Sequence, residues 1–367
     1  ADIDLAVKGI KEGATDFIVK PWDNQKLVET LLSAATQAKG GKKKHTKQEN
    51  NSCNSMYWGE SSAMQQLRQL IEKVAVTDAN ILITGENGTG KTTILKMVYA
   101  AAQAPNENQR EVSSYFFHNY FSRNTKVRDL VANTKDLIEN PRFEVSNGVK
   151  SFCGVFSRDT LFSYNTDPNW DMSAVFIPTT EMLSHSNGFL ALNQKYQMPF
   201  DQTQVDIIVN ASLPEAKEMP SYMQAILDKI STAIDGEVIQ QDDEFYVLKK
   251  DGRKLRFSLE AEGLRKLGLL WKLIRNGLLE PGTILIWDEP EANLNPELFS
   301  LVAEILLELQ KNGIQIFVAT HSYNFAKYLE IRRAEIEQVQ FHNLYHSEQP
   351  GVIEASSAYR MEDLHDN

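Results

Sequence analysis

A glycine-rich segment with a lysine and two threonines is the clearest candidate for chemistry in this chain of 367 residues. Residues 85–92 read GENGTGKT and match the pattern GxxxxGK[ST] at every fixed position. Glycines let successive backbone N–H groups turn toward phosphate oxygens, and the positive end of a following helix adds to the attraction. We expect Lys91 to bridge the β- and γ-phosphates of a nucleotide, and the hydroxyl of Thr92 to bind magnesium. The predicted nucleotide site comprises Gly85, Glu86, Asn87, Gly88, Thr89, Gly90, Lys91, Thr92 and Thr93.

Two adjacent carboxylates follow an apolar segment at residues 283–290, which read TILIWDEP. We expect Asp288 to bind the magnesium ion, directly or through water. Glu289 is expected to orient or deprotonate the water that attacks the γ-phosphate, as is usual in phosphoryl transfer. An Asp-Glu pair at the end of a strand is common by itself, so this interpretation depends on the phosphate loop.

A histidine ends a further apolar segment, IQIFVATHS, at residue 321. A single histidine in such a place is usually structural. His321 follows Glu289 by 32 residues, however, and a parallel sheet would bring both to the phosphate site. A neutral imidazole can donate a hydrogen bond without a permanent charge. We therefore expect His321 to contact the γ-phosphate or the attacking water, so Glu289, His321 and Lys91 are the candidate catalytic residues.

Apolar periodicity predicts the elements that must hold these residues. Strands are expected at 79–84, 283–287 and 314–319, and helices at 62–76, 261–276, 296–311 and 324–330. Strands that alternate with helices indicate a parallel sheet with ligands at the carboxyl ends of its strands. Residues 111–258 mix both kinds of element, with a hairpin signal at Asp251-Gly252. The predicted fold is α/β, a P-loop NTPase whose mostly parallel sheet is flanked by helices, with 111–258 as a mixed α+β insertion.

Composition divides the chain into three expected parts. Residues 1–38 contain two stretches with helical spacing around a short strand. Residues 39–56 are polar and rich in Gly and Lys, so they cannot bury enough apolar surface to offset the entropy of ordering. We interpret them as a linker. The nucleotide-binding head is expected at 57–367.

The overall composition limits the partners that can be expected. The net charge of −11 opposes nonspecific binding of nucleic acid, so DNA is a partner that the charge does not support. The dense basic run at 41–47 lies in the expected linker. Cys53 and Cys153 form no CxxC pair and suggest neither a disulfide framework nor a zinc site. No apolar run approaches the roughly 20 residues that cross a bilayer, so we expect a cytoplasmic protein without membrane contact.

From residue 81 onward the motifs resemble those of ABC-type ATPase heads, the "AAA family ATPase" group with SMC, RecF-like and OLD-like proteins. GENGTGKTTILK is similar to the Walker A motif, ILIWDEPEANLNP to the Walker B motif and D-loop, and FVATHS to the H-loop. SLEAEGLRKLG occupies the signature position, with Gly263 lying 25 residues before Asp288. Ser258 lies further from that glycine than the family pattern places it. No Q-loop glutamine is assigned.

This resemblance implies a head that hydrolyses ATP with Mg²⁺ and joins a second copy of itself around two nucleotides. Gly263 and Asn293 are then expected near the partner's phosphates. A separate effector protein would use the cycle, in DNA repair or phage defence. The family's strands before the phosphate loop are missing, together with the aromatic residue that stacks on adenine. Tyr57 or Trp58 is a candidate substitute, although a stray aromatic is the more common outcome.

The N-terminal part resembles a different family, the response regulators that activate sigma-54 promoters. DIDLAVKGIKEGATDFIVKPWD is similar to the end of a receiver domain, including its Lys20-Pro21 pair. Residues 59–91, GESSAMQQLRQLIEKVAVTDANILITGENGTGK, resemble the start of an AAA+ module. The alternative function is a transcription activator of that class. It is disfavoured because the GAFTGA loop motif is absent and 197 residues separate Lys91 from Asp288. An inactive fusion fragment is the third alternative.

Overall fold

A computed structural model of the chain describes residues 80–86, 88–104, 120–121, 142–156, 162–167, 170–196, 198, 200–347 and 352–365. All of them belong to the compact unit formed by residues 56–367. Several expectations lie outside the described residues: the receiver-like segment at 1–38, the linker at 39–56, the helix at 62–76, Tyr57, Trp58 and Asn87.

The main sheet has six strands in the order β12-β11-β1-β10-β9-β5. They are β1 (Asn80–Gly85), β5 (Ala174–Ile177), β9 (Ile284–Asp288), β10 (Gln315–Ala319), β11 (Val339–His346) and β12 (Ile353–Ala358). Neighbours pair in parallel except β11 and β12, which are antiparallel. The register aligns Ile83 of β1 with Ala319 of β10, and Ala319 with Asp288 of β9. The carboxyl ends of β1, β10 and β9 therefore lie side by side, as the predicted α/β P-loop fold requires.

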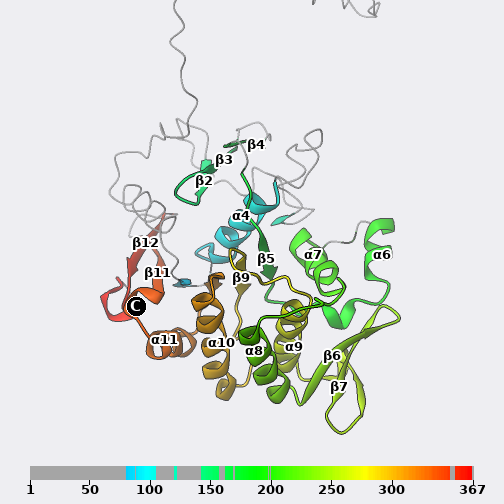
Figure 1. Cartoon of the computed structure of the whole chain (residues 1–367). Coiled ribbons are helices and arrows are strands. Elements are labelled where there is room, and N and C mark those ends of the chain that lie inside the picture. Colours follow the sequence, from blue (N-terminus) through cyan, green and yellow to red (C-terminus); the bar gives the residue numbers. More distant parts are fainter. Residues whose placement is uncertain are drawn as a thin grey trace, which may run out of the picture. The chain divides into compact units, whose positions relative to one another are not determined.

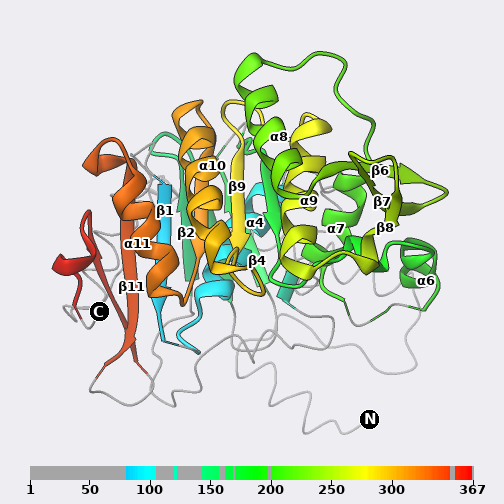
Figure 2. The same cartoon turned by 90° about the horizontal axis from the view of Figure 1, so that it is seen from below.

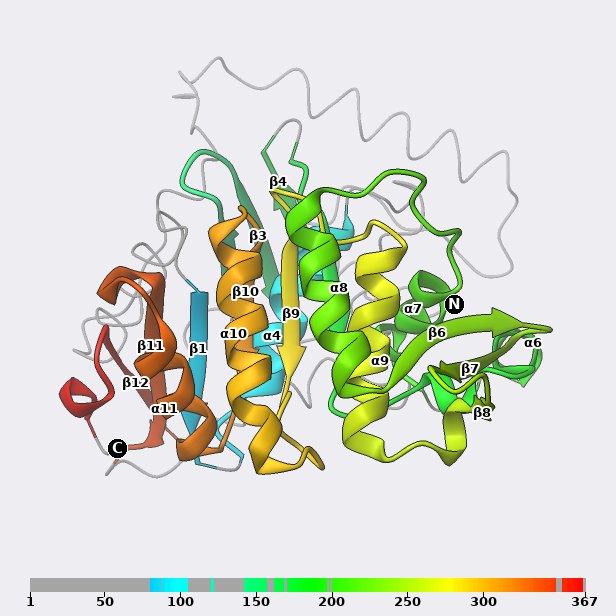
Figure 3. The same cartoon turned by 60° about the horizontal axis from the view of Figure 1, so that its bottom comes forward.

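Helices cover both faces of this sheet, with α4 on one face and α8, α9, α10 and α11 on the other (Figure 1, Figure 2). Figure 3 shows α8, α9 and α10 next to one another in front of the strands. The helices are α4 (Lys91–Gln103), α6 (Phe189–Tyr196), α7 (Gln202–Ala211), α8 (Ser221–Ala233), α9 (Glu262–Arg275), α10 (Phe299–Lys311) and α11 (Tyr323–Arg332). Short 3-10 helices occur at Leu183–His185, Phe257–Leu259, Pro296–Leu298, Ile336–Gln338 and Met361–Asp363. No helix among these described residues is long and apolar enough to span a bilayer.

Side chains alternate between the two faces of each strand, which explains the apolar runs in the sequence. Ile81 and Ile83 of β1 join the buried cluster that contains α4, whereas Leu82 joins the cluster on the opposite face. A strand that is buried on both faces reads as a continuous apolar segment. This is why ANILIT, TILIW and IQIFVA were recognisable as strands from the sequence.

The segment expected as an insertion, 111–258, contributes directly to the main sheet. Two small antiparallel sheets lie in it, β2 (Arg142–Ser146), β3 (Ser151–Phe156) and β4 (Phe162–Thr166), and β6 (Gly236–Gln241), β7 (Glu244–Lys249) and β8 (Lys254–Arg256). The turn between β7 and β8 contains Asp251-Gly252, as the hairpin signal predicted. Between the two small sheets, however, β5 pairs in parallel with β9 at the edge of the main sheet. The insertion is therefore interrupted by a strand of the head itself.

The helix that follows the phosphate loop is joined to α7 by two polar contacts. Lys96 Nζ lies 2.7 Å from Oδ2 of Asp201, and the hydroxyl of Tyr99 donates to Asp206 at 2.9 Å. Asp201 also caps α7, because its side chain accepts from the backbone N–H of Gln204 while the Gln204 side chain accepts from the Asp201 N–H. These contacts hold α7 to α4, and α7 lies beside the edge strand β5.

A buried histidine on β11 makes folding stability depend on pH. His342 is 3% exposed, its Nδ1 lies 2.9 Å from Oγ of Ser357, and its Nε2 has no hydrogen-bond partner among the described residues. Burial lowers the pKa of His342 from 6.5 to about 4. Between these values the unfolded chain binds a proton that the folded chain excludes. Stability from this group is therefore complete above pH 6.5 and is lost as the pH falls toward 4.

We expect the substitution His342→Asn to flatten this dependence. The wild-type free energy of unfolding should fall by about 3 kcal/mol more than that of the variant over this pH window, at 1.36 kcal/mol per pKa unit. Urea unfolding at several pH values measures the difference. His346→Asn, at an exposed position of the same strand, is the matched control. Parallel curves for wild type and His342→Asn would contradict the prediction.

Candidate nucleotide-binding site

The phosphate loop connects the end of β1 to the first turn of α4. Gly85 has a φ of 132°, and a Cβ atom on it would lie 2.0 Å from the carbonyl oxygen of Leu344 on β11. A side chain cannot fit there, so the close approach of β11 requires glycine. Gly90 precedes α4 in the left-handed conformation, with a φ of 88°. The hydroxyl of Thr89 donates to the carbonyl of Glu86 at 2.8 Å and closes the loop.

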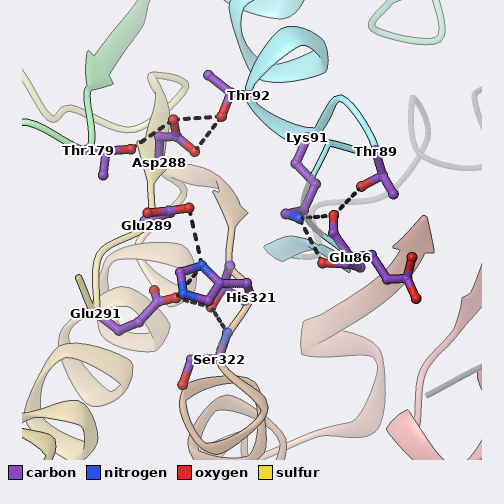
Figure 4. A network of polar contacts seen from close by, with 12 residues as sticks. Glu86, Thr89, Lys91, Thr92, Thr179, Asp288, Glu289, Glu291, His321 and Ser322 are labelled. Atoms are coloured by element: carbon purple, nitrogen blue, oxygen red, sulfur yellow. Dashed lines mark hydrogen bonds and ion pairs between the residues drawn. The ribbon is translucent and has the colours of Figure 1, made fainter. Parts of the chain in front are cut away.

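The side chain of Lys91 is folded onto this loop. Its ammonium donates to the carbonyl oxygens of Gly85 at 2.7 Å and Glu86 at 2.8 Å (Figure 4). Burial lowers the pKa of Lys91, and the negative charges of Glu289, Asp288 and Glu291 oppose that shift. The lysine of the loop and the acidic end of β9 therefore act on each other electrostatically and belong to one site.

Asp288 lies at the end of β9 between two hydroxyl groups (Figure 4). Its Oδ2 accepts from the hydroxyl of Thr92 at 2.9 Å and from that of Thr179 at 3.0 Å. Burial raises the pKa of Asp288, and the hydrogen bonds from Thr92 and Thr179 oppose that rise. A buried carboxylate is costly to ionise without a cation, and hydroxyl and carboxylate oxygens are the ligands that magnesium prefers. The residues therefore fit a magnesium ion.

Thr92 and Asp288 would supply only part of a magnesium shell. Within the part of the chain that the structure describes, no group of three or more His, Cys, Asp and Glu side chains could hold a metal ion by itself. Magnesium is usually bound through one or two carboxylates together with substrate phosphates. The site therefore fits an ion that arrives with a nucleotide.

Glu289 and His321 come from the ends of adjacent strands and face each other (Figure 4). Nδ1 of His321 lies 3.2 Å from Oε1 of Glu289, and the side chains are 48% and 28% exposed. The backbone N–H of Glu289 donates to the carbonyl of Ala319 at 2.9 Å, which continues the pairing of β9 and β10. The sequence expectation that a parallel sheet brings these two residues together therefore agrees with the geometry. Both side chains remain accessible to water.

A second glutamate beside this pair was not identified from the sequence. Glu291 is 6% exposed, its Oε1 accepts from the hydroxyl of Thr320 at 2.5 Å, and that oxygen lies 4.0 Å from Nδ1 of His321. Burial raises the pKa of Glu291, and the hydrogen bond from Thr320 opposes it. The signal available in the sequence was a third carboxylate two positions after Glu289, in WDEPE.

Thr179 occupies a position for which the sequence offered no residue. It follows β5 directly after Pro178, and its hydroxyl binds the same carboxylate oxygen of Asp288 as Thr92 does. No glutamine of a Q-loop could be assigned from the sequence. The loop after the strand next to β9 instead brings a threonine to the carboxylate. The sequence feature that could have indicated Thr179 was the short apolar run AVFI followed by PTT.

The two residues expected near a partner's phosphates lie against each other within this chain. A Cβ atom on Gly263, in the first turn of α9, would lie 2.7 Å from the carbonyl oxygen of Asn293 and 2.8 Å from Cα of Leu294. Gly263 is buried, whereas Asn293 is exposed with a φ of 61°. The close approach of helix and loop accounts for glycine at position 263. Ala261, before the helix, is exposed.

Two family models match separate parts of the chain. Residues 187–326 match the family described as "AAA domain, putative AbiEii toxin, Type IV TA system". Residues 57–116 match the family described as "Sigma-54 interaction domain". The first match contains Asp288, Glu289 and His321, and the second contains the phosphate loop. Both resemblances expected from the sequence are confirmed.

The curated relatives match a small part of the chain. A regulatory protein LuxO of Vibrio cholerae is 35% identical over 101 residues, which are 28% of this chain and 22% of the relative. A transcriptional regulatory protein ZraR of Klebsiella oxytoca is 35% identical over 102 residues, 28% of this chain and 23% of the relative. The chain thus spans less than a quarter of the length of these relatives.

Solved structures with a similar course of the chain have low sequence identity. The SMC head domain from Thermotoga maritima is 15% identical, with a TM-score of 0.45, and the alignment covers 77% of this chain and 91% of that domain. An ATP-binding cassette of an ABC transporter in its ADP conformation is 14% identical, with a TM-score of 0.31 and coverage of 73% and 76%.

The main sheet and the matched family together describe a P-loop domain of the ATPase type. The glycine-rich loop follows its first described strand, and the carboxylates follow a neighbouring strand.

Proposed function

We propose that this chain binds ATP with magnesium and hydrolyses the bond to its γ-phosphate. The observation that carries the proposal is the arrangement of two pairs at the carboxyl edge of the sheet, Thr92 of α4 with Asp288, and Glu289 with His321. Phosphoryl transfer needs positive charge at the phosphates, ligands for a metal ion and a group that positions the attacking water. The phosphate loop with Lys91 supplies the positive charge. Thr92 and Asp288 supply the metal ligands, and Glu289 with His321 supplies the group that positions the water.

Lys91 is proposed to hold the β- and γ-phosphates. Its ammonium now donates to two neutral carbonyl oxygens of the loop, and the anionic oxygens of a nucleotide would compete for it. The ammonium is charged in both kinds of contact, but a phosphate oxygen also carries negative charge, so the coulombic attraction favours the phosphates. The N-terminal end of α4 adds backbone N–H groups and a positive dipole at the same place.

Glu289 is proposed as the general base. Its carboxylate takes a proton from a water molecule, the oxygen of that water bonds to the γ-phosphorus, and the bond to the bridging oxygen breaks to give ADP and phosphate. Nδ1 of His321 lies within hydrogen-bond distance of Oε1, so the imidazole can share that proton or hold the carboxylate in place. Magnesium, when bound by Thr92, Asp288 and the phosphates, would neutralise charge on the transferred group.

The activity is tested by measuring the release of phosphate from Mg-ATP at increasing protein concentration. Specific activity should rise with concentration, because the resemblance to ABC-type heads leads us to propose a homodimer around two nucleotides as the active form. A constant specific activity would leave ATP hydrolysis in place but contradict the dimer. An absence of phosphate release would contradict the proposed activity itself.

The proposed homodimer gives a prediction about mass. A Glu289→Gln protein should double its mass in light scattering with Mg-ATP, because unhydrolysed γ-phosphate holds the two copies together. Adding Ala261→Arg, at the exposed residue before α9, should cancel the doubling without changing ATP affinity. This position is a better choice than Gly263, where any side chain would strike the loop at Asn293 within the same chain.

Ala334→Arg is the matched control for that experiment. Ala334 is also exposed, but it lies before β11, at the opposite ends of the parallel strands. Mg-ATP should still double the mass of the Glu289→Gln protein that carries it. A doubling that survives Ala261→Arg would contradict a partner contact at the start of α9.

The setting of the activity is proposed from the resemblances. A separate effector protein that responds to the ATP cycle, in phage defence or DNA repair, is the expected partner. The family description that names a putative toxin of a type IV system supports a defence role for residues 187–326. The transcription-activator alternative is supported by the match at 57–116 and by the matches to LuxO and ZraR. Binding to the sigma-54 factor in the presence of ATP would favour it.

A further inference from the structure

A buried lysine beside the candidate base has no role in the mechanism proposed above. Lys266 lies in α9 and is 1% exposed, and its Nζ donates to the backbone carbonyl of Glu289 at 3.0 Å. Burying an ammonium group is costly unless it is hydrogen-bonded, so this contact is a strong constraint on both partners. The helix thereby reaches the backbone of the residue that is proposed to activate water.

The backbone of Glu289 is held in an uncommon conformation. Its φ is 50°, in the left-handed region that residues with a side chain rarely adopt. Its N–H donates to Ala319 at 2.9 Å, and its carbonyl accepts both from the N–H of Ala292 at 3.1 Å and from Lys266. Such conformations persist where the surroundings impose them, and they occur often at functional sites.

The first turn of α9 is attached to the same loop at a second point. Gly263 approaches the backbone of Asn293 and Leu294 so closely that a Cβ atom would not fit. Lys266 follows on the next turn and reaches back to Glu289. Helix α9 thus contacts the loop after β9 at both ends of the short segment 289–294, through Lys266 at one end and Gly263 at the other. A displacement of α9 would therefore be transmitted to the backbone of Glu289.

We propose that Lys266 is a positioning residue, which fixes the backbone of Glu289 and so connects the first turns of α9 to the carboxylate that activates water. The proposal rests on the ATP hydrolysis proposed above. Lys266 itself touches neither nucleotide nor water in this role. It acts by holding Glu289 in the conformation that aims the side chain toward His321.

The substitution Lys266→Met tests this role, since methionine keeps an unbranched apolar side chain without the ammonium. We expect kcat to fall by a factor on the order of 10 to 10², because misplacing a catalytic group by about 1 Å costs up to this much. ATP affinity should stay within twofold. Lys272→Met is the matched control, since Lys272 is a buried lysine of the same helix that pairs with Glu215 at 3.0 Å instead.

A double-mutant cycle with Glu289→Gln separates positioning from a general structural role. If Lys266 acts through the carboxylate of Glu289, then Lys266→Met should change the residual single-turnover rate of the Glu289→Gln protein by less than twofold. An equal loss of rate in both backgrounds would overturn the proposal, and so would an equal loss in Lys272→Met. A parallel loss of ATP affinity would also overturn it.

The outcomes distinguish this proposal from the proposed function. If Glu289→Gln leaves the wild-type hydrolysis rate unchanged, the assignment of the base fails. If Glu289→Gln strongly lowers the hydrolysis rate and Lys266→Met lowers the rate by the same factor with or without Glu289→Gln, only the role of Lys266 fails. Should Lys266→Met lose its thermal unfolding transition, the same cycle is run with Lys266→Arg, which keeps a charged donor in a different geometry. Its loss of rate should likewise disappear in the Glu289→Gln background.

Discussion

The Glu289→Gln protein is expected to hydrolyse ATP more slowly than the wild type by a factor on the order of 10² to 10⁴, the usual contribution of a positioned general base. Glutamine keeps the size and the hydrogen-bonding reach of glutamate, but it cannot take a proton from the attacking water. The phosphate loop and Asp288 are unchanged, so ATP affinity should survive. Single-turnover hydrolysis with radiolabelled ATP measures the rate, and calorimetry measures the affinity.

Glu297→Gln is a suitable control for the loss of one negative charge on the same segment. Glu297 is exposed in the 3-10 helix Pro296–Leu298. The Glu297→Gln protein should therefore hydrolyse ATP at the wild-type rate. A Glu289→Gln protein that retained more than a tenth of the wild-type rate would contradict the role of Glu289. The side chain would then serve the site by its shape or its contact with His321 alone.

The Lys91→Ala protein is expected to lose measurable ATP binding. The substitution removes the ammonium that is proposed to reach two phosphates, and a hydrogen bond to a charged group contributes about 1.5–3 kcal/mol. Two such bonds correspond to an affinity lower by a factor on the order of 10² to 10⁴. Wild-type protein at a ligand concentration of 100 times its Kd should gain about 2.7 kcal/mol of stability, and the variant at the same concentration should gain less than about 0.5 kcal/mol.

Thermal unfolding with and without Mg-ATP measures this difference. Without nucleotide the variant should unfold close to the wild-type temperature. Loss of the bonds from Lys91 to Gly85 and Glu86 is offset because a buried ammonium no longer has to be desolvated. Retained ATP affinity in calorimetry would show that the loop binds phosphate without this lysine. The placement of the nucleotide would then have to be revised.

The sequence predicted the elements whose signals are local. The phosphate loop has a fixed pattern of residues, and β9 and β10 are apolar on both faces, so each could be located from a short window. The strand β5 could not, because its four residues AVFI are placed in the main sheet only by pairing with β9, more than 100 residues later. Sequence reasoning therefore assigned it to an insertion.

The supporting residues of the candidate site were missed for the same physical reason. Lys266 reaches Glu289 across 23 residues, Thr320 reaches Glu291 across 29, and Thr179 reaches Asp288 across 109. Each contact depends on where the packed helices and strands bring the backbone. A lysine in an amphipathic helix and a threonine after a short strand carry no pattern of their own. The residues that are proposed to touch the nucleotide could be recognised from the sequence, whereas the residues that hold them in place required the fold.

The contact between Gly85 and β11 has a consequence for the order of events during synthesis. β1 lies between β10 and β11, and the hydroxyl of Thr84 donates to the side chain of Asn343, 259 residues later. A nascent chain that has not yet reached residue 344 lacks the strand against which Gly85 packs. The phosphate loop is thus translated before β11, the strand against which it packs. Domains fold as units when their parts have emerged. If the head binds nucleotide as proposed, capture should therefore begin only after β11 has left the ribosome, so that a bound nucleotide would mark a head in which β11 is already in place.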